Sequence, residues 1–165
     1  MGTAIGWSGP YERLRYTILA AQREGDRRLT EALRDVGLTT SQAEVLRVLE
    51  DQEPMTLREL GEHLICERGS PSRLVKTLTA AQIVAVSTVE TDGRAMRLTL
   101  TARGNRLAAR VKAVEHEFYS ALGRGLSTQQ ADEISSLLCH LIGNSDGARA
   151  LSRRASIEGG ILDSM

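Results

Sequence analysis

The sequence predicts a mainly α-helical protein with one small β-hairpin, and three observations support this fold class. Leucine, alanine, arginine and glutamate are abundant, which favours helices. Apolar residues recur at spacings of three and four over most of the chain. The exception is residues 83–101, where two β-rich segments flank an Asp-Gly pair, a strong hairpin signal. We therefore expect helices on both sides of a central unit that contains the hairpin.

The overall composition is that of one ordinary globular domain covering residues 1–165. Hydrophobic residues make up 41% and charged residues 25% of the 165 residues. The two cysteines have no paired spacing, which argues against a disulfide framework and fits a reducing compartment. No signal peptide and no apolar run of membrane-spanning length is evident. We expect a soluble cytoplasmic protein with no membrane partner.

A long N-terminal helix is predicted over residues 10–36. Pro10 suits its first turn and Gly37 suits its end. One small domain would cover its long apolar stripe only in part, so we expect a second subunit to cover the rest. The stripe consists of Tyr11, Leu14, Ile18, Ala21, Gly25, Leu29, Leu33 and Val36.

Three short helices are predicted to follow, each with a recognisable start. The hydroxyl residues 39–41 precede the first, and Thr56 with Glu59 forms a capping box at the second. Ser70 caps the third, with Pro71 at its first position. Gly61 would allow the last two helices to cross closely, as a helix-turn-helix requires. The inner face of the second helix is predicted to consist of Leu57, Leu60 and Leu64.

The third short helix has an outward face suited to a DNA groove. This face is predicted to carry Ser72, Arg73, Lys76, Thr77 and Thr79. Arginine can pair with guanine, while serine, threonine and lysine reach bases or phosphates. Taken alone, the same pattern also fits an ordinary solvated helix face.

The hairpin that follows favours the DNA-binding interpretation. Its turn is predicted at residues 91–94, where Arg94 lies at the tip and Asp92 either orders the turn or pairs with Arg94. A hairpin directly after a helix-turn-helix is the layout of a winged helix, whose wing can enter a minor groove or contact phosphates. Residues 68–106 contain seven basic and two acidic residues in a chain of zero net charge, so this segment can attract phosphates. Residues 38–101 are therefore predicted to form a winged helix-turn-helix core.

Two C-terminal helices are predicted within residues 102–143. Thr101 caps the first and Ser127 caps the second. The first has a stripe of Leu107, Val111, Val114, Phe118 and Leu122, and the second turns Ile134, Leu137, Leu138, Leu141 and Ile142 inward. For residues 144–165 we expect a short additional helix around residues 148–156 and a frayed end.

Residues 38–104 resemble the core of the MarR family of bacterial transcription regulators. The segments that carry the resemblance are LTTSQAEVLRVLEDQEPMTLRELGEHL, PSRLVKTL and DGRAMRLTLTARG. The order of flanking helices is also similar, so the resemblance extends from about Tyr11 to Ile142. It implies a homodimer held by helices 10–36 and 102–143, which binds a pseudo-palindromic DNA operator. The implied function is transcriptional regulation, most often repression released by a small molecule.

The resemblance also implies which residues act. DNA would be contacted by Ser70, Ser72, Arg73, Lys76, Thr77, Arg94 and Arg97. The wing turn holds Asp92 and Gly93, and Gly93 stands where relatives often have an arginine, which predicts a weaker wing contact. A small aromatic or phenolic effector would bind in a crevice near Arg15, Tyr16 and His116.

Catalytic and metal-binding chemistry finds little support in the sequence. His63, His116 and His140 are scattered, with no catalytic triad order or phosphate-binding glycine loop. The His63–Cys66 and Cys139–His140 pairs have ligand-like spacing, but a zinc site needs three or four converging ligands. We expect no enzyme, no cofactor and no metal.

Cys66 motivates an alternative mode of control. It lies just before the predicted DNA-reading helix and near Arg68, where its thiolate would be favoured and oxidation could displace that helix. The simpler interpretation is a small residue that packs the turn, and Cys139 is expected in the core. The alternatives are thus a thiol-based redox sensor acting through Cys66, or a winged helix used only for protein interaction.

Overall fold

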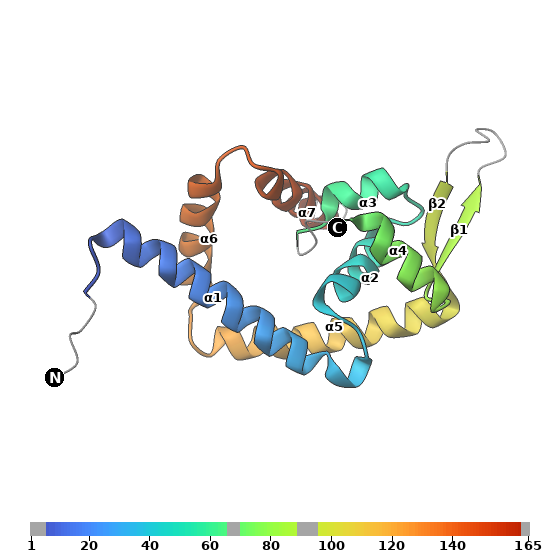
Figure 1. The fold of residues 1–165 in the computed structure, drawn as a ribbon, viewed down its shortest axis with the longest axis horizontal. Coiled ribbons are helices and arrows are strands. Elements are labelled where there is room, and N and C mark those ends of the chain that lie inside the picture. Colours follow the sequence, from blue (N-terminus) through green and yellow to red (C-terminus); the bar gives the residue numbers. More distant parts are fainter. Residues whose placement is uncertain (1–5, 66–69, 89–95, 163–165) are drawn as a thin grey trace.

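The computed structural model describes residues 6–65, 70–88 and 96–162, with only the backbone described for residues 156–162. It confirms a mainly helical protein with one hairpin (Figure 1). The elements are α1 (Pro10–Ala32), the 3-10 helix η1 (Arg34–Val36), α2 (Thr40–Gln52), α3 (Leu57–His63), α4 (Pro71–Ala80), β1 (Val84–Thr88), β2 (Met96–Leu100), α5 (Ala102–Gly123), α6 (Thr128–Ile142) and α7 (Asp146–Leu162).

The predicted helix starts are confirmed by their capping hydrogen bonds. Thr39, Thr56 and Ser127 each form a complete capping box with the residue three positions later. Ser70 and Thr101 accept a backbone N–H from the third residue of α4 and α5. These side chains satisfy N–H groups that have no partner within the helix, so they fix the residue at which each helix begins.

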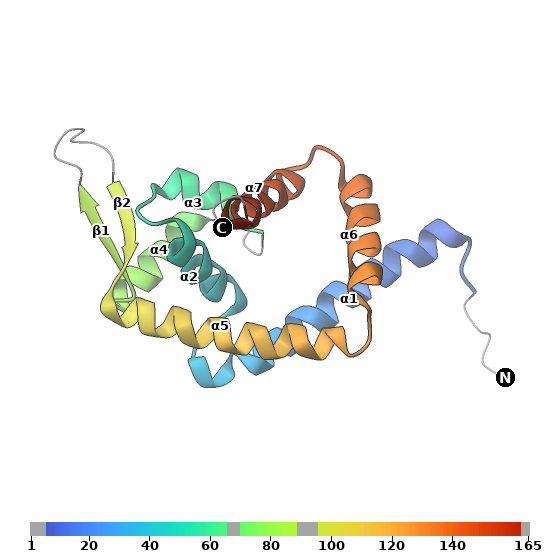
Figure 2. The same cartoon turned by 180° about the vertical axis from the view of Figure 1, so that it is seen from behind.

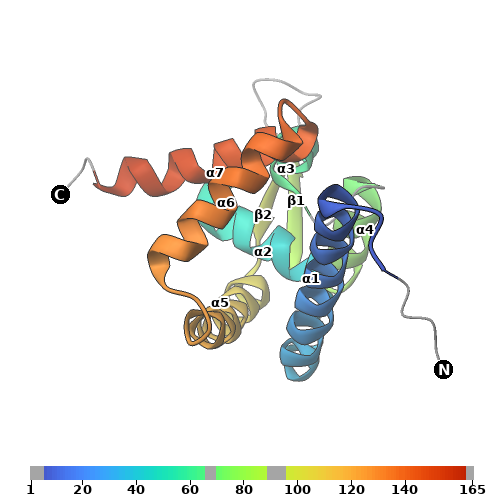
Figure 3. The same cartoon turned by 90° about the vertical axis from the view of Figure 1, so that its left-hand side faces the viewer.

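The elements are arranged as a helix-turn-helix with a hairpin at one end and long helices that extend from it. Figures 1 and 2 show α2, α3, α4 and the hairpin grouped together, with α1 and α5 running away from this group toward α6. Viewed along the molecule in Figure 3, α1 and α5 flank α2, and α7 lies beside α3. Helix α7 thus brings the C-terminal segment back to the helix-turn-helix.

One hydrophobic core joins α2, α3, α4, the hairpin and the start of α5. Its fully buried members include Leu46, Leu49, Leu60, Leu78 and Val84. A smaller cluster of Leu33, Val36, Ala43 and Val111 attaches the end of α1 to α2 and α5. The core therefore holds α4 on a rigid base.

The hairpin is extended and anchored by contacts that sequence patterns did not indicate. Strands β1 and β2 are antiparallel, with Val84 opposite Leu100, and Met55 adds a bridge to Leu98 through two backbone hydrogen bonds. At the base of the hairpin, a Cβ on Gly104 would lie 2.2 Å from the carbonyl oxygen of Ile83. A residue without a side chain is therefore required where α5 crosses the end of β1.

Several expectations about the helix ends are corrected. The N-terminal α-helix does not continue to Val36, because α1 ends at Ala32. The 3-10 helix η1 follows it and ends before Gly37, whose φ is +76°. The C-terminal helix is longer than the predicted 148–156 segment, because α7 spans Asp146–Leu162 and docks on α3. Contacts between distant segments, rather than local signals, account for α7.

Burial also differs from the prediction at three places. Leu57 is exposed rather than part of the inner face of α3. Cys139 is exposed rather than in the core. The apolar stripe of α6 does not point inward within this chain, since Leu137 is 71% and Leu141 is 58% exposed. Helical periodicity identifies an apolar face but not what covers it.

Candidate nucleic-acid interface

Helix α4 is held so that one face enters the core and the other is presented to solvent. Val75 and Leu78 are buried, while Ser72, Arg73, Lys76, Thr77 and Thr79 are exposed. At the start of the helix, the Ser70 hydroxyl accepts the backbone N–H of Arg73 and lies 2.7 Å from the Ser72 hydroxyl. Helix α3 packs against this same end of α4. A Cβ built on Gly61 would lie only 3.2 Å from Cγ of Pro71.

The exposed face of α4 offers two cations for an anionic partner. Neither Arg73 nor Lys76 forms an ion pair with the residues that the structure describes. The Thr77 hydroxyl donates to the Arg73 carbonyl at 3.0 Å and keeps its acceptor capacity. A helix face with unpaired cations and short hydroxyl side chains is suited to phosphates and base edges.

Arg97 is placed differently from the α4 cations. Its guanidinium Nη1 lies 3.1 Å from Glu59 Oε2, so it joins β2 to α3. The carboxylate of Glu59 also accepts the backbone N–H and the hydroxyl of Thr56. These hydrogen bonds, led by the backbone N–H, lower the pKa of Glu59 and keep it ionised beside Arg97. Arg97 therefore holds β2 against α3, in addition to any contact with DNA.

Four of the residues predicted from the sequence lie outside the described residues. These are the wing-turn residues Asp92 and Gly93, the wing-tip residue Arg94, and Cys66. The wing contact and the redox alternative remain predictions.

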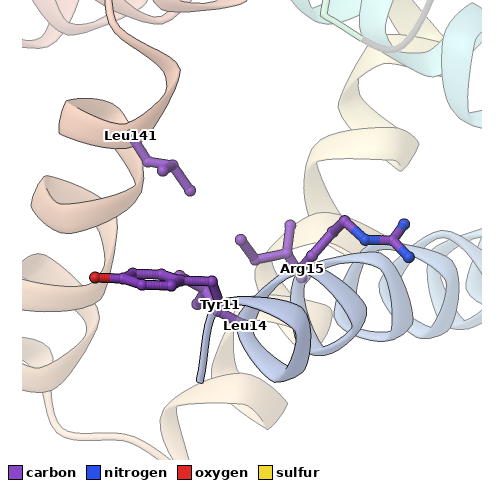
Figure 4. A pocket seen from close by; sticks show the side chains of 5 residues that line it. Tyr11, Leu14, Arg15 and Leu141 are labelled. Carbon is purple, nitrogen blue, oxygen red and sulfur yellow. The ribbon is translucent and has the colours of Figure 1, made fainter. Parts of the chain in front are cut away.

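Of the three residues predicted to line an effector crevice, Arg15 borders one of the two cavities described here. The guanidinium of Arg15 stacks 4.0 Å from the ring centroid of Tyr16 near the start of α1. Arg15 also borders an apolar cavity of about 290 Å³ between α1 and α6, as Figure 4 shows. Its other lining residues are Tyr11, Leu14, Ile18 and Leu141. His116 is exposed on α5 and lines neither this cavity nor the crevice described next.

A second cavity, of about 300 Å³, is the crevice between the winged helix core and the long helices. It is bordered by residues of α1, α2, α3, α5 and α7. Arg47 lines it and pairs with Glu115 at 3.2 Å and with Glu50. Burial raises the pKa of Glu115, and the Arg47 guanidinium opposes this shift. We refer to this cavity, lined by Leu29, Thr40, Glu44, Arg47, Val48, Asp51, Gln52, His63, Glu115, Tyr119 and Arg154, as the charged crevice.

The charged residues of this crevice were not predicted from the sequence, although the sequence contains one signal for them. Glu44 stands within an otherwise apolar stretch of α2, between Ala43 and Val45, and it is only 7% exposed. A buried acidic side chain in a helix indicates that the fold supplies it with hydrogen-bond or ion-pair partners. Its partners come from α7 and from the turn after α3, which no periodicity could have indicated.

Two further properties concern the described part of the chain only. No group of three or more histidine, cysteine, aspartate or glutamate side chains there could hold a metal ion. No helix there combines the length and apolar character needed to cross a bilayer.

A family model described as a winged helix DNA-binding domain matches residues 38–104. Among solved structures, a mutant MarR from E. coli complexed with operator DNA is similar, with a TM-score of 0.71 at 22% identity, covering 79% of this chain and 94% of that chain. The protein has a winged helix core and the MarR fold. The boundaries expected from the sequence, 38–101, differ from the matched range only by the first turn of α5, which contains Gly104.

Two further comparisons extend the likeness to the MarR fold. The regulator SarZ of Staphylococcus epidermidis is 29% identical over 93 residues, which span 56% of this chain and 63% of that regulator. The organohalide-sensing regulator RdhR, in its 2,4-dichlorophenol-bound form, has a TM-score of 0.74 at 16% identity, covering 87% of this chain and 90% of that chain. The resemblance to the MarR family inferred from sequence segments is thus confirmed.

Proposed function

We propose that this protein is a dimeric transcriptional regulator that binds a specific DNA operator through α4. The observation that carries the proposal is the exposed face of α4, where Arg73 and Lys76 lie beside Ser72 and Thr77 on a buried base. The matched domain model is one of DNA binding, and the similar MarR structure was solved with operator DNA. The expected location is the cytoplasm, and no step of this function requires catalysis.

A second copy of the chain is the proposed partner of the apolar faces that this chain leaves exposed. These faces lie on α1 and just before it, at the end of α5 and on α6. Their largest side chains are Trp7, Tyr11, Leu14, Tyr16, Tyr119, Leu122, Ile134, Leu137, Leu141 and Ile142. An apolar surface of this extent on the long helices is typical of a permanent homodimer interface. Two α4 helices would then contact half-sites one turn of DNA apart, on the order of 34 Å.

Release from DNA by a small molecule is the proposed mode of control, with repression as the default action. The charged crevice lies between the α4-bearing core and the long helices, so a ligand there contacts both. An anionic aromatic ligand would compete with carboxylates for Arg47 or Arg154. The ligand would favour a spacing of the α4 helices that does not match the operator. The dichlorophenol-bound structure of RdhR, which shares the fold, supports an effector of this class.

A footprint on the DNA flanking its own gene tests the DNA-binding proposal. Wild-type protein is expected to protect a pseudo-palindromic site, and Arg73→Ala and Lys76→Ala are expected to weaken protection while the dimer stays folded. Arg27→Ala is the matched control, because this exposed arginine lies on α1 and pairs with Glu24 of the same helix. If both α4 variants bound as well as wild type at fixed salt, DNA recognition by α4 would be abandoned. Absence of any salt-dependent binding would favour a protein-interaction module instead.

A further inference from the structure

The C-terminal helix α7 leaves α6 and docks on the helix-turn-helix. Gly143 lies at the junction with a φ of +55°, a conformation that favours glycine and that turns the chain toward α3. Figure 1 shows α7 beside α3, and in Figure 3 α7 extends to the side of the molecule away from α4. Ala150 of α7 is 2% exposed, so this helix is packed rather than loosely attached.

The first polar contact of α7 is made at the C-terminal end of α3. Arg153 Nη1 donates to the Glu62 backbone carbonyl at 3.0 Å, and Arg153 Nη2 lies 3.3 Å from Glu62 Oε2. The last four carbonyls of a helix lack partners within that helix, and a cation there is favoured by the helix dipole. Arg153 therefore stabilises the end of α3, immediately before the turn that leads to α4.

The second polar contact involves the buried carboxylate of Glu44. Arg154 of α7 forms an ion pair with Glu44 of α2. The same Glu44 oxygen accepts the backbone N–H of Ile65 at 2.8 Å, at the start of the turn between α3 and α4. One carboxylate thus joins α2, the turn and α7. Because Glu44 is only 7% exposed, Arg154→Ala would remove a charged partner from a nearly buried carboxylate.

Docked α7 leaves the DNA-reading face open. The side chains of Ser72, Arg73, Lys76 and Thr77 remain exposed while both α7 contacts are made. Within the described residues, the polar contacts of Arg153 and Arg154 are with Glu62 of α3 and Glu44 of α2. The helix is therefore placed to position the recognition helix and not to block it.

We propose that α7 is a clasp, formed by Arg153 and Arg154, that holds the end of α3 and Ile65 in the arrangement that binds DNA. Without the clasp, the hydrogen bond from Ile65 to Glu44 opens more often, and binding DNA must first restore it. The effect on DNA rests on the proposed function, whereas the effect on the turn does not.

Hydrogen exchange measured by NMR on the full-length chain tests the clasp without DNA. Arg154→Ala is expected to speed exchange of the Ile65 amide about tenfold, equivalent to about 1.4 kcal/mol. Arg153→Ala is expected to speed exchange in the last turn of α3. This variant leaves no buried charge behind, because the side chain of Glu62 is 39% exposed. Arg154→Lys, which keeps the charge, should restore most of the protection. Arg149→Ala is the matched control, since Arg149 lies on α7 but pairs with Asp146 of the same helix.

DNA affinity of the same variants, measured by fluorescence anisotropy on the footprinted duplex, completes the test. Loss of the clasp is expected to weaken binding about 3- to 30-fold, while Arg149→Ala binds like wild type. Unchanged exchange at Ile65 and α3 in both Arg153→Ala and Arg154→Ala would overturn the clasp, whatever the DNA result. Faster exchange with unchanged affinity would overturn its role in DNA binding. Failure of the wild-type protein to bind any duplex would instead contradict the proposed function.

Discussion

Arg97 of β2 and Glu59 of α3 form an ion pair, with Arg97 Nη1 3.1 Å from Glu59 Oε2. The same carboxylate completes the capping box of α3 by accepting the backbone N–H and the hydroxyl of Thr56. Glu59 therefore has two roles: it fixes the start of the helix-turn-helix, and it ties the wing strand to it. A residue predicted for DNA contact, Arg97, is thereby also part of the scaffold.

The first prediction concerns the pH dependence of this contact. The pKa of Glu59 is lowered, chiefly by the Thr56 backbone N–H, so its ionised form is favoured in the folded state. Its stabilising contribution should be complete above the ordinary carboxyl pKa of about 4.5 and should disappear as pH falls through the lower folded-state pKa. Urea denaturation should show Glu59→Gln less stable than wild type at pH 7, with the difference shrinking below pH about 4.5. A difference that did not vary with pH would contradict this assignment.

The second prediction concerns the close crossing at Gly104. A Cβ there would lie 2.2 Å from the Ile83 carbonyl oxygen, which is backbone and cannot move aside cheaply. Gly104→Ala should lower the free energy of unfolding by about 1–3 kcal/mol, measured by thermal or urea denaturation. Gly25→Ala is the matched control, because a Cβ on Gly25 of α1 meets nothing within 4 Å in this chain. That change should stabilise the helix by about 0.5–1 kcal/mol, and equal effects at the two glycines would contradict the crossing geometry.

The third prediction concerns the salt dependence of DNA binding. If Arg73 or Lys76 contacts a phosphate, its replacement by alanine removes the release of a counterion. The slope of log affinity against log salt should then decrease by about 1 for each phosphate-binding side chain that is removed. A variant that binds more weakly and with less sequence discrimination, but with an unchanged slope, would instead identify that side chain as a base contact. Titrations at four salt concentrations distinguish these outcomes from a loss of folding.

The fourth prediction concerns the exposed stripe of α6. Leu137→Asp and Leu141→Asp would place a charge in the proposed dimer interface, and each should weaken dimerisation at least about a hundredfold. Sedimentation velocity should show a monomer fraction that grows on dilution. Ser136→Asp, on the side of the same helix away from the apolar stripe, should leave the dimer intact. A dimer that survived both leucine substitutions would place the subunit interface elsewhere.

Local sequence signals predicted the winged helix core well because its elements begin at hydrogen bonds formed within a few residues. Thr39, Thr56, Ser70, Thr101 and Ser127 each accept an N–H from a residue three positions ahead. Such contacts need no information from the rest of the chain. The exposed face of α4 was also predicted from local sequence, because 3.6-residue periodicity places Arg73 and Lys76 on a different side of the helix from buried Val75 and Leu78.

Contacts between distant segments were beyond sequence reasoning. Met55 bridges Leu98, Arg47 pairs with Glu115, and Arg154 pairs with Glu44. Burial of Cys139 and of the α6 stripe was predicted from apolar neighbours and is wrong for this chain. Periodicity reports that a face is apolar, whereas its burial depends on which other segment, or which other molecule, lies against it.

By itself, the sequence determined the helices, the hairpin and the face of α4 that reads DNA in the proposed function, because caps, turns and periodicity act over a few residues. Only the tertiary structure decided where α7 goes. Its docking depends on a buried Glu44 that lies 110 residues from Arg154 in the chain. A nearly buried carboxylate must find its partners wherever the fold brings them, so the clasp becomes visible only once α2, α3 and α7 are assembled.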